Sequence, residues 1–187
     1  MISAIPFLLP LFFQLGFGWS AAQAGVIIIA LFLGNLGIKP FTTPMMRRWG
    51  IRTVLLIALP MSAAALLGMA ALQSTTALPI MVGLLAFSGI FRSVGFSAYN
   101  SVAFADVPTD RMTHANTLQE LGAGLGIAVG ALLVRVGDPV SAALGLSDTP
   151  ATAYRVAFVL LALLLLAPLV EAITMPRSAG GAVTGRQ

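Results

Sequence analysis

The chain consists of long apolar blocks that contain almost no charge, and this pattern restricts its fold more than any other feature. Hydrophobic residues make up 58% of the sequence and charged residues 9%, whereas a soluble domain carries about 25% charged residues. The hydrocarbon core of a bilayer is about 30 Å thick, so a helix that crosses it needs roughly 20 apolar residues. The sequence therefore predicts an all-α integral membrane protein that lies in the lipid bilayer.

The apolar blocks predict about six transmembrane helices joined by short connections. Their ranges are 1–17, 25–40, 53–72, 78–96, 113–136 and 154–175. The first block is short and begins without the basic stretch of a signal peptide, so we expect its helix to be truncated. Residues 1–176 are then expected to form one transmembrane bundle. The tail at 177–187 is polar and glycine-rich, and we expect it to be disordered.

Proline and threonine residues predict where several helices begin or end. Lys39-Pro40 and Thr43-Pro44 are expected to stop the second helix, because proline lacks a backbone donor and restricts the residue before it. Thr113 is expected to cap the fifth helix with its hydroxyl group. The stretch 137–152 contains two proline-turn sequences and is predicted to be the longest connection.

The distribution of basic residues predicts how the chain lies in the membrane. Lys39, Arg47, Arg48 and Arg52 gather between the second and third blocks, and short loops rich in lysine and arginine stay in the cytoplasm. Alternation then places 137–152 outside and the C-terminus in the cytoplasm of a multi-pass protein of the inner (plasma) membrane. The net charge of +4 reflects these loops. No nucleic-acid recognition motif accompanies it, so we expect no nucleic-acid partner.

The fifth block carries a ladder of three glycines. Gly122, Gly126 and Gly130 are spaced by four residues, which puts them on one face of a helix. In lipid, helices associate through close approach at small residues, because no hydrophobic force draws them together. The ladder predicts a helix-packing seam. Whether that seam is only a tight contact or also a surface on which helices rock is left open by the spacing.

Two charged residues lie well inside predicted spans. Arg92 is in the fourth block and Glu120 in the fifth, and consecutive antiparallel helices bring them to similar depth. A charge within a span is costly and usually faces a cavity or a partner. One interpretation is a structural ion pair, or an Arg92 whose head group reaches the inner headgroups. The other is that both residues lie on a substrate or proton pathway.

Polar residues add three further pathway candidates and no catalytic site. Gln14, Asn100 and Gln119 either line the same pathway or form hydrogen bonds between helices. The chain has no cysteine and one histidine, so thiolate catalysis and a Cys- or His-based metal site are excluded. No nucleophile–base pair, phosphate-binding loop or catalytic pair of carboxylates is present. We therefore expect neither an enzyme, nor a bound metal, nor a cofactor.

Three stretches of the sequence carry a resemblance to a known family. Residues 6–14 and 18–25 look like a helix that opens the C-terminal half of a transporter and the outer turn after it. Arg47-Arg48-Trp-Gly50-Ile-Arg52 is similar to the repeat copy of a cytoplasmic motif, motif A, whose core reads Asp-Arg-x-Gly-Arg. Val107-Pro108 leads into the glycine ladder in the family's order. The chain resembles the major facilitator superfamily, specifically the fourteen-span drug:proton antiporter branch.

The resemblance implies that the chain is the C-terminal six-helix half of such a fold. Arg47 stands where motif A has aspartate, and Glu120 stands where glutamine is more usual. The implied function is efflux of hydrophobic or amphipathic small molecules, with the proton gradient as driving force. Alternating access needs a second half, so a missing N-terminal half is an implied partner. The alternatives are a metabolite exporter, a non-transporting membrane fragment and, least favoured, an integral membrane enzyme.

Overall fold

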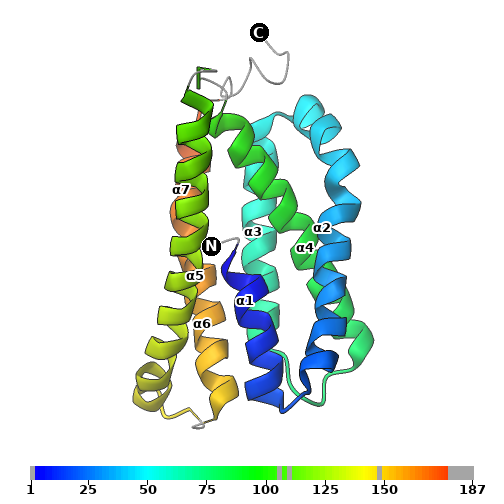
Figure 1. Cartoon of the computed structure of the whole chain (residues 1–187), viewed down its shortest axis with the longest axis vertical. Coiled ribbons are helices and arrows are strands. Elements are labelled where there is room, and N and C mark those ends of the chain that lie inside the picture. Colours follow the sequence, from blue (N-terminus) through cyan, green and yellow to red (C-terminus); the bar gives the residue numbers. More distant parts are fainter. Residues whose placement is uncertain (1–2, 105–106, 109–110, 147–148, 177–187) are drawn as a thin grey trace.

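A computed structural model of the chain describes residues 3–104, 107–108, 111–146 and 149–176, and these residues form helices and no strands. The helices run lengthwise through one elongated bundle (Figure 1). The elements in chain order are α1 (Ala4–Leu11), the π-helix η1 (Phe12–Gly16), α2 (Ala21–Trp49), α3 (Ile51–Ala70), α4 (Leu78–Ala103), α5 (Met112–Ala143), α6 (Pro150–Leu164) and α7 (Leu166–Thr174). The predicted all-α membrane fold is confirmed, whereas the predicted disordered tail at 177–187 lies outside the described residues.

Five helical stretches of the described residues are long and apolar enough to cross a membrane. The remaining predicted span, the first in the sequence, corresponds to α1 with η1. It is an apolar stretch at Ala4–Gly16 that is shorter than the other five. It occupies only part of the bundle's length, starting near mid-height and running toward the end where α6 begins (Figure 1). Helices α6 and α7 together make one span, Pro150–Thr174, with a break at Leu165.

The predicted end of the second helix near residue 40 is wrong. Helix α2 continues through Pro40 and Pro44 to Trp49. Proline is tolerated inside membrane helices because neighbouring helices and serine or threonine side chains can satisfy the backbone groups that it disturbs. Between the two prolines, the Thr42 hydroxyl donates to the Ile38 carbonyl oxygen at 3.0 Å, a carbonyl group that neither proline deprives of its helical donor. The second span is therefore longer than the proline pattern predicted.

Two further boundary predictions around α5 are wrong. Arg111, not Thr113, is the N-cap residue of α5, and it makes no side-chain capping hydrogen bond. The hydroxyl group of Thr117 donates instead to the Thr113 carbonyl oxygen, one turn inside the helix, at 3.0 Å. At its other end α5 runs through Pro139 to Ala143. The predicted connection at 137–152 is therefore mostly helical, and α6 starts with Pro150, where a missing backbone donor costs nothing.

Helices α2 and α4 cross at two glycines that sequence analysis did not identify. A Cβ atom added at Gly34 would collide with the Ala86 carbonyl group, and one added at Gly89 would collide with the Leu31 carbonyl oxygen. Only glycine allows the two backbones to approach this closely. Figure 1 shows α4 crossing α2 and then leaving it toward α5 at the upper end of the bundle.

Arginine side chains join α3 to the antiparallel α6 and α7 at both ends. At one end Arg52 Nη2 donates to the Ile173 carbonyl oxygen at 2.7 Å. At the other, Arg155 Nη2 donates to the Leu72 carbonyl oxygen at 2.9 Å. The last carbonyl groups of a helix lack partners within the helix and carry partial negative charge. Each arginine therefore satisfies a helix end and fixes the register of the pair.

Candidate functional site

A cavity of about 610 Å³ lies within the bundle, beyond the N-terminal end of α1. Its lining comes from α1, α3, α4, α5, α6 and α7, and from Ser3 just before α1. Helix α1 begins partway along the bundle, and the helices around it continue past this level (Figure 1). The size of the cavity falls within the range of about 300–1,000 Å³ that is typical of small-molecule sites.

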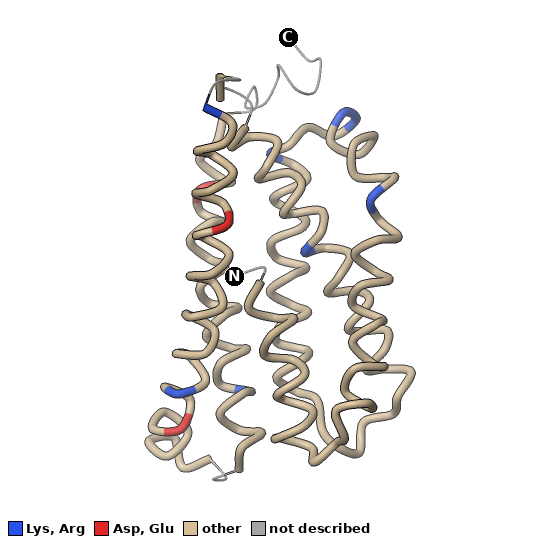
Figure 2. The backbone as a smooth tube through the Cα atoms, viewed as in Figure 1, with Lys and Arg blue, Asp and Glu red and all other residues tan. Residues whose placement is uncertain are grey.

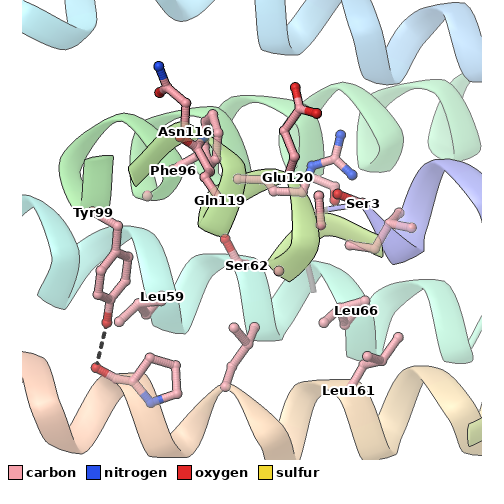
Figure 3. A pocket seen from close by; sticks show the side chains of 18 residues that line it. Ser3, Leu59, Ser62, Leu66, Phe96, Tyr99, Asn116, Gln119, Glu120 and Leu161 are labelled. Atoms are coloured by element: carbon pink, nitrogen blue, oxygen red, sulfur yellow. Dashed lines mark hydrogen bonds between the residues drawn. The ribbon is translucent and has the colours of Figure 1, made fainter. Parts of the chain in front are cut away.

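The cavity has a polar side and an apolar side. Figure 3 shows Ser3, Asn116, Gln119 and Glu120 grouped on one side of it. On the opposite side, α3 and α6 contribute mostly apolar side chains, namely Leu59, Leu66 and Leu161, together with the hydroxyl group of Ser62. The arrangement suits a molecule that has both an apolar body and a polar or charged group.

Arg92 and Glu120 both line this cavity. Arg92 lies on α4 and is only 6% exposed, whereas Glu120 lies on α5 and is exposed. Helix α4 ends and α5 begins at the same end of the bundle (Figure 1). From these helix ends, Arg92 lies about 16 Å deep and Glu120 about 12 Å deep at 1.5 Å per residue. The cavity therefore has one group of each charge at comparable depth along the helices that carry them.

Tyr99 fixes one boundary of the cavity. It lies on α4 and its hydroxyl group donates to the Pro168 carbonyl oxygen of α7 at 2.9 Å (Figure 3). Both residues line the cavity. This hydrogen bond joins two helices that are far apart in the sequence, and it holds these two walls of the cavity at a fixed separation.

The structure brings three of the five predicted pathway residues to the cavity and leaves two elsewhere. Arg92, Gln119 and Glu120 line it. Gln14 lies in η1, where its backbone carbonyl accepts from Gly18 at 3.1 Å, and it is not among the lining residues. Asn100 is half-buried near the end of α4 and does not line the cavity either.

Sequence analysis missed Ser62 and Asn116 as cavity residues. Asn116 lies four residues before Glu120 on α5, so helical periodicity puts the two on one face. That spacing was a usable signal for Asn116. Ser62 lies in an apolar stretch of α3, and nothing in its local sequence separates a cavity-lining serine from one that bonds within its own helix.

The three glycines of the predicted seam have different surroundings. Gly130 lies against α1, and an added Cβ atom would come within 2.9 Å of the Ala4 Cβ and 3.2 Å of Leu8 Cδ1. Gly126 is buried. Gly122 lines the cavity, and an added Cβ atom there would meet nothing within 4 Å. The ladder therefore passes from a helix contact at Gly130 to open space at Gly122.

The motif A-like residues form the tight turn between α2 and α3, away from the cavity lining. Gly50 has a φ of 81°, a conformation that favours glycine. Arg47 and Arg48 are exposed in the last turn of α2, where positive charge complements the helix dipole. Arg52 bonds to the end of α7, as described above. Figure 2 shows positive residues on this end of the bundle.

The part of the chain that the structure describes contains no group of three or more His, Asp or Glu side chains able to hold a metal ion. The charged groups at the cavity are Arg92 and Glu120, which have opposite sign and come from different helices. Such a pair can bind a charged group of a ligand or exchange a proton at the carboxyl group.

A family model described as Major Facilitator Superfamily matches residues 1–182. A probable transport protein, HsrA, of Haemophilus influenzae is 30% identical over 72% of this chain and 30% of its own length. A putative multidrug resistance protein, MdtD, of Yersinia enterocolitica is 28% identical over 94% of this chain and 38% of its own. A protein of the same name from Escherichia coli is 32% identical over 70% and 28%, respectively. The chain thus spans about a third of the curated relatives it matches, and no solved structure matches it.

Proposed function

The chain belongs to the major facilitator superfamily, and we propose that it forms one wall of an exporter of hydrophobic or amphipathic small molecules driven by the proton gradient. The two-sided cavity carries this proposal. It offers an apolar surface of leucines on one side and Asn116, Gln119 and Glu120 on the other. A membrane-soluble molecule with one polar group can satisfy both sides.

The proposed transporter contains a second half that this chain does not supply. Transporters of this kind bind substrate between two helical halves and alternate by rocking one against the other. The curated relatives are about three times as long as the matched part of this chain. We therefore assign the opposite wall of the site to a further set of helices, which is a partner of this bundle together with the lipid bilayer.

In the proposed orientation, the turn between α2 and α3 faces the cytoplasm, as does the C-terminus, in the inner (plasma) membrane. The exposed Arg47 and Arg48 support it, because basic loops stay on the cytoplasmic side. The cavity lies toward this end of the bundle, because two of its lining residues do. Arg92 is nearer to the end of α4 than to its start, and Glu120 is nearer to the start of α5 than to its end.

Glu120 is the proposed proton-coupling group. It is the one carboxylate among the described residues that line the cavity. In a transporter that contains this chain and its missing half, Glu120→Gln keeps the size and hydrogen bonding of the side chain but removes the proton. We expect gradient-driven uptake of substrate into everted vesicles to stop while equilibrium binding of substrate persists.

A cavity-filling pair of variants tests the binding site itself. Gly122 and Gly124 both lie on α5, both are exposed, and both have open space around an added Cβ atom, but only Gly122 lines the cavity. In the intact transporter, Gly122→Leu should weaken substrate binding and Gly124→Leu should leave it unchanged. Equal effects of the two would refute the cavity as the binding site.

The same assays distinguish the alternative functions. An intact protein that exports a hydrophilic metabolite but no amphipathic compound would support a metabolite exporter. Efflux that persists in Glu120→Gln would place the coupling group elsewhere in the protein. Should the intact protein move no solute while it folds and inserts, the chain is a membrane fragment that only assembles with partners.

A further inference from the structure

A second cavity, of about 330 Å³, opens between α2, α3 and α4 on the side of the bundle away from the site described above. Its lining is entirely apolar and includes Ile38, Met45 and Trp49 of α2, Ile57 of α3, and Phe91 and Val94 of α4. No residue of this apolar groove lines the first cavity. The groove is therefore separate from the proposed substrate site.

The helix crossing explains why the groove exists. Helices α2 and α4 are in backbone contact at Gly34 and Gly89, and they separate toward the end of the bundle where α2 turns into α3 (Figure 1). Helix α3 closes the wedge between them. Along α2 the groove extends from Ile38 to Trp49, about 16 Å at 1.5 Å per residue. That length matches one leaflet of a hydrocarbon core about 30 Å thick.

Two arginines directly precede Trp49, which lines one end of the groove, and no acidic residue is near them in the sequence. Arg47 and Arg48 are exposed and directly precede Trp49, which lines the groove and is 49% exposed. No aspartate or glutamate occurs in the sequence before Asp106. Tryptophan is characteristic of the membrane interface, so the mouth of the groove lies at headgroup level. An apolar slot one leaflet long, with two arginines at its headgroup end, is complementary to an anionic lipid.

We propose that this groove binds one anionic phospholipid, with an acyl chain between α2, α3 and α4 and the phosphate group at Arg47 and Arg48. Basic pockets between membrane helices are suited to anionic headgroups. The volume of about 330 Å³ accommodates a single acyl chain.

The test is lipid titration of the purified chain in detergent, followed by native mass spectrometry at low salt. The probes are phosphatidylglycerol and phosphatidylcholine with identical acyl chains. Each basic residue near an anionic surface contributes about fivefold in affinity. We therefore expect phosphatidylglycerol to bind about 25-fold more tightly than phosphatidylcholine. In Arg47→Gln/Arg48→Gln this preference should disappear, whereas Arg111→Gln, which changes an exposed arginine elsewhere, should retain it.

A second pair of variants tests the apolar part of the site. Ile57 and Leu67 both lie on α3 and are 43% and 50% exposed, but only Ile57 lines the groove. Ile57→Trp should weaken the binding of both lipids, and Leu67→Trp should weaken neither. Equal affinities of the two lipids for the unaltered chain would overturn the proposal, as would a dimer that forms regardless of lipid. If Ile57→Trp unfolds the chain, the arginine pair still decides the outcome.

Discussion

The α2–α4 crossing makes a quantitative prediction about one methyl group. Gly89→Ala adds a Cβ atom that collides with the Leu31 carbonyl oxygen and comes within 3.0 Å of the Asn35 backbone nitrogen. Both obstacles are backbone atoms, so no side-chain rotation relieves the collision and the helices must separate. Overpacking of a tight core costs about 1–3 kcal/mol, and we expect the upper end of that range because backbone has to move.

Helix propensity acts in the opposite direction and can be measured separately. Alanine favours a helix over glycine by about 1 kcal/mol. At Gly83, also on α4, an added Cβ atom meets nothing within 4 Å. Gly83→Ala should therefore stabilise the bundle by up to about 1 kcal/mol. At Gly89 the collision costs about 3 kcal/mol and the higher helix propensity of alanine offsets about 1 kcal/mol, so Gly89→Ala should destabilise the bundle by about 2 kcal/mol. The free energies of unfolding of the two variants should therefore differ by about 3 kcal/mol.

Thermal unfolding of the purified chain in one detergent measures this difference. Gly89→Ala should lower the midpoint relative to the unaltered chain, and Gly83→Ala should hold or raise it. Gly68→Ala provides an intermediate case, because its nearest obstacle is the Leu84 Cδ1 atom at 2.8 Å, which can rotate away. If Gly89→Ala and Gly83→Ala unfold alike, the backbone contact at the crossing is not present and the argument for a splayed groove also fails.

Two further predictions concern the arginine contacts and the orientation. Arg155→Gln removes a charged donor from the Leu72 carbonyl oxygen and should destabilise the bundle by about 1.5–3 kcal/mol; Arg135→Gln, at an exposed position of α5, should change the unfolding midpoint little. Because the chain has no native cysteine, cysteine introduced at the exposed Ser74 or Thr113 is a unique label. An impermeant maleimide should label Ser74→Cys and spare Thr113→Cys in intact cells, and the reverse result would invert the proposed orientation.

The fold class was accessible from sequence because it depends on composition and length. Apolar blocks of about 20 residues leave few alternatives to transmembrane helices. Helix ends were predicted less well because they depend on tertiary support. Pro40 and Pro44 are helix-breaking residues by local rules, yet α2 continues through both. The same failure occurred at Pro139. In a membrane bundle, neighbouring helices and side chains can support a helix through proline, and rules based on local sequence do not include that support.

The candidate site was only partly predictable, for a related reason. Arg92 and Glu120 attract notice because charge within an apolar block is costly wherever it lies, and both line the cavity. Gln14 and Asn100 are polar in the same blocks, but an amide can be satisfied locally, and neither lines it. The sequence also drew attention to the glycines with regular spacing on α5. The closest backbone approach instead joins α2 and α4, where Gly34 meets Ala86 and Gly89 meets Leu31.

Close packing and open space are linked in this bundle. Straight helices that touch at one level and cross at an angle must separate elsewhere, so the tight contact at Gly34 and Gly89 requires a wedge beyond it. That wedge becomes the apolar groove where α3 closes it. The larger cavity is a separate space beyond the N-terminal end of α1, and Arg92 of α4 is among its lining residues. A variant that fills the groove should therefore change lipid binding but not substrate binding. Gly122→Leu, which fills the cavity, should change substrate binding but not lipid binding. A variant in either site that altered both would show that the two spaces are coupled through α4, which lines each of them.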